Sequence, residues 1–169
     1  MSEIAYGWRE GPGKGREIGI AASQYFHRRG GHFVYIDSSG DVNLCGSVNV
    51  TVGYSLNTAA SSVYGWLETP KDTDGYNSWK SSGTAGNDKA FVIYGLEDVF
   101  EIPAADTTTA SLSYIGRHAA INLSGADGTY NRTQTAKYYG TAASTCLEIV
   151  DADEANQTVF VKIKPAYKQ

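Results

Sequence analysis

The sequence lacks most of the features that identify an enzyme, a membrane protein or a disulfide-stabilised secreted domain. Its 169 residues include two cysteines, four prolines and one methionine, and no apolar run approaches the roughly 18 residues of a membrane span. Cys45 and Cys146 fit no CxxC or Cys/His spacing, so we expect two buried free thiols rather than a zinc cage or a disulfide framework. The opening residues contain no apolar run either, so we expect no secretory signal and folding in the cytoplasm.

The motifs of common catalytic sites are missing as well. There is no GxSxG, GxxxxGK[ST] or HExxH sequence. The GPGKG cluster at 11–15 resembles a phosphate loop only superficially, because no apolar strand precedes it and no helix follows it. The D-x-D pairs at 72–74 and 151–153 lack the glycine and glutamate of a calcium loop and indicate turns. We therefore predict a protein that is not an enzyme and has no metal and no cofactor.

The charge of the chain is weakly acidic and unevenly distributed. Fourteen basic and 18 acidic residues give a formal net charge of -4. The chain as a whole therefore lacks the excess of positive charge that binding to nucleic-acid phosphates requires. Residues 1–31 hold five basic and three acidic residues and so carry +2, which leaves -6 for residues 32–169. The sequence thus indicates no nucleic-acid or membrane partner, but a positive N-terminal segment beside an acidic domain.

Short strands and turns dominate what is present. The chain has 19 glycines and 12 tyrosines, a balance that favours strands and turns over long helices. One short helix is expected within 104–116, and about seven or eight strands elsewhere. We predict an all-β fold, a compact antiparallel β-barrel or sandwich with an extended N-terminal arm and at most one short helix. The expected strands and hairpins include 32–36 with 42–45, 64–69, 90–94, 98–102, 119–123 with 130–138, and 146–150 with 158–163.

Residues 1–31 differ from the single β-barrel domain expected over 32–169. Their glycines make a continuous helix improbable, and they are too poor in apolar periodicity to form a core of their own. A disordered terminus and an extended arm that lies on a neighbouring subunit both fit this composition. Trp8, Ile18 and Ile20 favour the arm, because apolar residues are unusual in a free tail.

The order of the expected strands resembles that of a family of tailed-bacteriophage structural proteins, the capsid decoration or cement proteins. The resemblance extends over residues 32–169 and depends on the pattern of strands and turns along the chain. It is carried by the segments FVYIDSSGDVNLCG (33–46), YGWLE (64–68), FVI (91–93) with DVFEIP (98–103), LEIVD (147–151) and VFVKI (159–163).

This resemblance implies a non-enzymatic protein on the capsid exterior of a virion. Such a protein binds across neighbouring major capsid protein subunits and stabilises the shell, and a homotrimer is expected ahead of a dimer. Apolar and basic side chains of the arm would then contact the capsid or a neighbouring copy. The residues expected to do so are Trp8, Arg9, Lys14, Arg16, Ile18, Ile20, Arg28 and Arg29.

An alternative function is a carbohydrate-binding or receptor-binding β-module. Aromatic residues in or near loops can form a flat platform on which sugar rings stack. Trp66, Tyr76 and Trp79 are the residues that would form such a platform.

Overall fold

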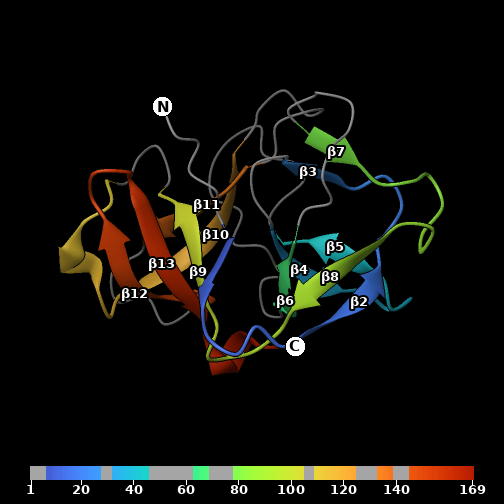
Figure 1. Ribbon diagram of the computed structural model, residues 1–169. Helices are drawn as coiled ribbons and strands as arrows, with labels where there is room; N and C mark the ends of the chain where they lie inside the picture. The colour runs from blue at the N-terminus through green and yellow to red at the C-terminus, as the bar shows by residue number, and fades with distance from the viewer. Residues whose placement is uncertain are drawn as a thin grey trace.

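The protein is an antiparallel β-sandwich (Figure 1), here a computed structural model that describes residues 7–27, 32–45, 63–68, 78–104, 109–124, 133–138 and 145–169. The predicted all-β class is confirmed. In chain order, the strands are β1 (Gly7–Glu10), β2 (Gly15–Gly19), β3 (Tyr25–His27), β4 (His32–Ile36), β5 (Val42–Leu44), β6 (Gly65–Leu67), β7 (Ser78–Lys80), β8 (Lys89–Ile93), β9 (Val99–Pro103), β10 (His118–Ser124), β11 (Thr133–Tyr138), β12 (Leu147–Asp153) and β13 (Thr158–Ile163).

These strands form two main sheets and one short pair. The larger sheet has the order β1-β9-β13-β12-β10-β11, and the smaller one has the order β2-β8-β6-β4-β5. Strands β3 and β7 pair separately. A closed barrel would leave no edge strands, whereas both main sheets have them, so the sandwich form of the prediction is correct and the barrel form is wrong.

The main core lies between the two sheets. Phe33 of β4 and Trp66 of β6 meet edge to face at 4.8 Å, and Trp66 stacks on Phe100 of β9 at 5.3 Å. Every second residue of β13 points into the same core, among them Val159 and Val161. This alternation is that of a strand with one covered face, and it makes the Trp66 indole the centre of the junction between the sheets.

A second, smaller core occupies the other face of the five-stranded sheet. It contains Val34 of β4 and Val92 of β8, together with Ile18, Ile20 and Phe26 from the N-terminal segment. Residues 7–27 are therefore extended, as predicted, but they pair with the domain's own strands instead of projecting from it. A boundary between arm and domain at residue 31 does not match this packing. Ile20, only 1% exposed, is a core residue and no anchor on a neighbour.

The predicted hairpins are confirmed at both ends of the domain. In the β4–β5 hairpin Ile36 lies opposite Val42, and the Asp37 carboxylate accepts hydrogen bonds from the backbone N–H groups of Ser39 and Asp41. In the β12–β13 hairpin the Asp153 carboxylate accepts from the N–H of Asn156 and from its side-chain amide, which lower the pKa of Asp153. The second predicted D-x-D turn thus closes a hairpin, whereas residues 72 and 74 lie outside the described residues.

Helical structure is limited to two single turns in the described part of the chain. The turn η2 (Leu112–Tyr114) falls within the predicted helix, where the Ser111 side chain accepts from the Ser113 N–H. Gly116, with φ of +79°, follows and reverses the backbone. The turn η3 (Pro165–Tyr167) precedes the last residues. No helix in the described ranges is long and apolar enough to cross a membrane.

Gln134 of β11 joins the two sheets through its buried side chain. Its amide accepts a hydrogen bond from the Phe33 N–H at 2.6 Å and donates to the carbonyls of Phe33 and Cys45 at 2.9 and 2.7 Å. One side chain therefore bonds to three backbone groups on the side of the opposite sheet, and this helps to satisfy polar groups that are buried between the sheets.

Replacing Ile20 with alanine tests whether the N-terminal segment belongs to the domain core. Loss of a buried isoleucine side chain should lower the free energy of unfolding by about 2–5 kcal/mol. Denaturant unfolding measures this, with the exposed Lys14→Ala as control, which should change it by less than about 0.5 kcal/mol. An Ile20→Ala protein as stable as the control would contradict the packing of Ile20 in the second core.

Both cysteines are buried free thiols, as expected, and should react slowly in the folded protein. Burial raises the pKa of Cys146 to about 11 and that of Cys45 well above its ordinary value. Because the thiolate is the reactive form, alkylation by iodoacetamide at pH 8 should be at least about 100-fold slower than in urea. Equal rates with and without urea, followed by mass spectrometry, would show that the thiols are accessible.

Candidate functional site

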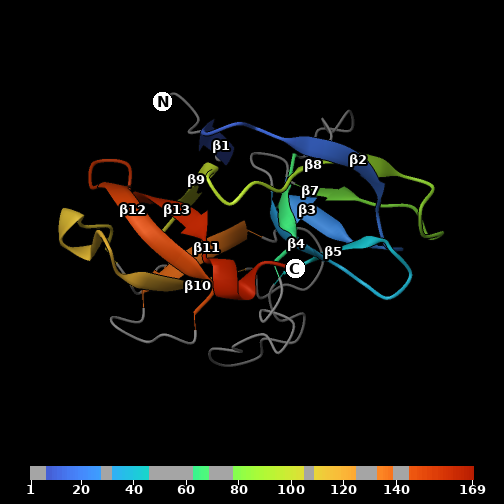
Figure 2. The same cartoon turned by 90° about the horizontal axis from the view of Figure 1, so that it is seen from below.

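The N-terminal ribbon, residues 7–19, links the edges of the two main sheets. Strand β1 pairs with β9, where Trp8 lies opposite Phe100, and β2 pairs with β8, where Gly15 lies opposite Ile93. Since β8 and β9 belong to different sheets, the ribbon passes from one sheet to the other and forms an edge of each. Figure 2 shows this course, with β1 and β2 joined along one side of the molecule.

The Asp98 carboxylate fixes the crossing point. Asp98 is fully buried, and its Oδ1 accepts hydrogen bonds from Trp8 Nε1 at 3.0 Å and from the Gly13 N–H at 2.8 Å. Gly11, with φ of +113°, passes so closely that a Cβ atom there would lie 2.6 Å from Asp98 Oδ1 and 2.8 Å from its Cα. The GPGKG cluster therefore wraps around the chain's own carboxylate and has no need of a bound phosphate to explain its glycines.

A second buried carboxylate holds β1 against the larger sheet. Glu101 of β9 is 6% exposed, and its Oε2 lies 2.6 Å from Arg9 Nε. Its other oxygen accepts a hydrogen bond from Thr158 Oγ1, also at 2.6 Å. Arg9, predicted to meet a neighbouring subunit, thus forms an ion pair within its own chain. In the β1–β9 register Gly7 lies opposite Glu101, and Arg9 falls at the irregularity between Trp8 and Glu10.

The other predicted arm residues are distributed over several environments. Ile18 joins Ile20 in the second core. The Arg16 guanidinium lies over the Tyr64 ring, 5.5 Å from its centroid, and Lys14 is exposed. Trp8 is 38% exposed even though its indole N–H is bonded. Positions 28 and 29, both arginine, lie outside the described residues.

Large exposed apolar side chains gather around the N-terminal ribbon. Phe91 of β8 is 45% exposed, and Leu96, in the connection from β8 to β9, also reaches solvent, as Trp8 does. The Phe91 ring lies over Gly15, where a Cβ atom would be 2.7 Å away. The expected strand 90–94 is present in β8, and Phe91 is its exposed aromatic residue. It lies on the face opposite to Ala90 and Val92, near the edge of the sheet.

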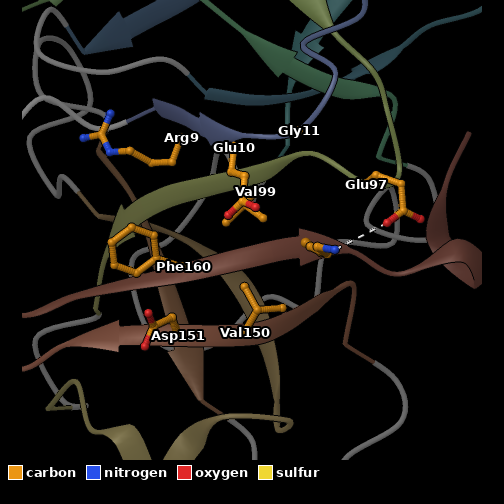
Figure 3. Close-up of a pocket in the computed structure, with 9 residues that line it drawn as sticks. Arg9, Glu10, Gly11, Glu97, Val99, Val150, Asp151 and Phe160 are labelled. Carbon is orange, nitrogen blue, oxygen red and sulfur yellow. Dashed lines mark hydrogen bonds and ion pairs between the residues drawn. The ribbon is translucent and has the colours of Figure 1, made fainter.

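A groove lies beside β1 on the outer face of the larger sheet (Figure 3). Its volume is about 630 Å³, and its walls come from β1, β9, β13, β12 and the connection before β9. Lys162 of β13 lies within 3.5 Å of Glu97 at one end. The groove was not predicted from the sequence, because its walls come from residues up to about 150 positions apart. The pairing of β1 with β9 brings these residues together. Its lining includes Glu10, Val99, Val150, Asp151, Phe160 and Lys162.

The proposed sugar-stacking platform loses one of its three members. Trp66 is completely buried between Phe33 and Phe100, so no ligand can reach its ring. Its place in the main core follows from the inward alternation of β6. Position 76 lies outside the described residues. Of Trp79, in β7, the structure describes only the backbone, which pairs with Phe26 of β3.

Metal-binding clusters are likewise absent from the part of the chain that the structure describes: no three His, Cys, Asp or Glu side chains come together to hold an ion.

Comparison of the chain with protein-family models, with curated proteins and with solved structures gave no match. Its function must therefore be inferred from its own residues.

Gly11→Ala tests the close contact at Asp98. The substitution adds a side chain to a residue with positive φ and presses it against the Asp98 backbone, which should cost about 2–5 kcal/mol of unfolding free energy. Gly40→Ala is the matched control, because Gly40 also has positive φ but open space around it, and it should cost about 1–2 kcal/mol. Equal losses for the two variants in denaturant unfolding would contradict the clash.

Proposed function

We propose that this chain is a structural protein that decorates the capsid of a tailed bacteriophage and stabilises the shell without enzymatic activity. Its partner would be the major capsid protein, bound across neighbouring subunits on the virion exterior, and a homotrimer would be the binding unit. The observation that carries the proposal is the surface along the N-terminal ribbon. Of five large apolar side chains exposed in the described residues, three belong to the ribbon or to β8 and its connection to β9.

The N-terminal ribbon has the properties of a docking edge. An edge strand offers unpaired backbone groups to a partner, and partly exposed aromatic residues such as Trp8 and Phe91 are typical anchors of protein interfaces. Lys14 and Arg16 are exposed on the same segment and would favour an acidic partner surface. Because Asp98 and Glu101 hold the ribbon in place, binding would require little ordering of the chain.

Shell stabilisation would then follow from mass action. A protein that binds assembled subunits but not unfolded ones shifts the equilibrium towards the shell. In a trimer, the first contact raises the effective concentration of the other two copies, so weak individual contacts can add up to firm attachment.

Surface variants of the ribbon test this function better than a deletion, because removing residues 1–31 would also remove Ile18, Ile20 and Phe26 from the second core. We expect the intact protein to co-sediment saturably with shells of the major capsid protein encoded by the same genome. The double variant Lys14→Glu/Phe91→Ser should bind at least about tenfold more weakly, a loss of about 1.4 kcal/mol or more, with an unchanged melting temperature.

Leu112→Ser is the control for this experiment, since Leu112 is also exposed but lies on η2, and it should bind shells normally. Absence of co-sedimentation by the intact protein would refute the decoration function. Equal binding by the double variant and the control would refute the role of the ribbon.

A further inference from the structure

We infer that the groove beside β1 binds an arginine side chain presented by a protein partner. The inference rests on the proposed function in one respect, which is that the ligand belongs to a protein that docks along the N-terminal ribbon. The location supports this link, because Arg9, Glu10 and Gly11 belong both to the ribbon and to the wall of the groove.

The apolar part of the groove suits the stem of a long side chain. Val99, Val150 and Phe160 come from three adjacent strands, β9, β12 and β13, and face the groove together. Phe160 is only half-buried, so its ring offers a surface to a ligand. The methylene groups of arginine or lysine pack well against such surfaces, and a cation over the ring face gains a further attraction.

Two carboxylates at the groove lack a cationic partner. Within the described ranges, the Glu10 carboxylate accepts no hydrogen bond and forms no ion pair, and the Asp151 carboxylate accepts only from the N–H of its neighbour Ala152, at 2.8 Å. Both side chains are exposed. They come from strands on opposite sides of β9 and β13, so Val99 and Phe160 lie between them.

The two cations of the groove are already paired with other carboxylates, one of which, Glu97, also lines the groove. Arg9 pairs with Glu101 and Lys162 with Glu97, so neither neutralises Glu10 or Asp151. A ligand that enters the groove therefore meets an apolar floor with unneutralised negative charge on both sides. That arrangement is complementary to an extended side chain with a positive head group.

Arginine fits this arrangement better than other cations. Its planar guanidinium carries five N–H donors, pairs with a carboxylate through two parallel hydrogen bonds and stacks on aromatic rings, whereas the lysine ammonium is a compact, strongly hydrated charge. A metal ion is disfavoured, because the described residues bring no three ligating side chains together.

The probe for this site is the peptide acetyl-Gly-Arg-Gly-amide, titrated into the intact 15N-labelled protein. We expect weak, saturable shifts of the backbone amide signals of Asp151 and Phe160. The same peptide with citrulline, a neutral analogue of arginine, should bind at least about tenfold more weakly, and the lysine peptide at least about threefold more weakly. These differences correspond to about 1.4 and 0.7 kcal/mol.

Two double variants locate the binding site. Glu10→Gln/Asp151→Asn should weaken binding of the arginine peptide at least about fivefold. The control Glu17→Gln/Glu154→Gln removes the same charge from exposed positions outside the groove lining and should bind within about twofold of the intact protein. Circular dichroism melting verifies that both variants fold.

The inference is overturned by equal binding of the citrulline or lysine peptide, by equal binding of the two double variants, or by the absence of saturable shifts. The outcome is separable from that of the shell experiment. Peptide binding by a protein that ignores shells would retain the arginine site and refute decoration, whereas shell binding without peptide binding would refute the arginine site alone.

Discussion

The contact between the Asp98 carboxylate and the N-terminal ribbon determines how the two sheets are joined. The chain crosses between sheets twice at this place, from β1 to β2 and from β8 to β9. A buried carboxylate costs free energy unless it is hydrogen-bonded, and Oδ1 receives two such bonds, both from the ribbon. Displacement of the ribbon would therefore leave Asp98 without these donors. The burial of one acidic side chain thus favours the paired arrangement of four strands.

Local features of the sequence were sufficient to predict the hairpins. The turn at Asp37 combines an aspartate that caps its own backbone with a glycine of positive φ, and it separates two short, mainly apolar segments. The Asp153 turn has the same kind of side-chain cap. In each case the signal lies within about ten residues of chain, because the pairing partners are neighbours in sequence.

The role of the N-terminal ribbon could not be predicted in this way. Arg9 and its ion-pair partner Glu101 are 92 positions apart, and nothing near Arg9 indicates that partner. The glycines of 11–15 indicated only that the segment is not a continuous helix, whereas the structure shows that the close approach to Asp98 requires Gly11. The exposure of Trp66 and Phe91 could not be predicted from the sequence either. An aromatic residue in a short strand is compatible with either face, and only the position of the opposite sheet decides that Trp66 is buried and Phe91 exposed.

Stability and recognition are divided between the two strands of the N-terminal ribbon. Strand β2 contributes Ile18 to the second core, whereas Gly7 is the only buried residue of β1. Its other three residues are exposed, although Trp8 and Arg9 also bond to the buried carboxylates of Asp98 and Glu101. A partner can therefore contact β1 without disturbing the core that β2 completes. The glycine segment between the strands, held by Asp98, keeps β1 fixed relative to β2. For this reason the surface that we propose for docking is a rigid edge of the sandwich, and changes in its exposed side chains can alter binding without altering the fold.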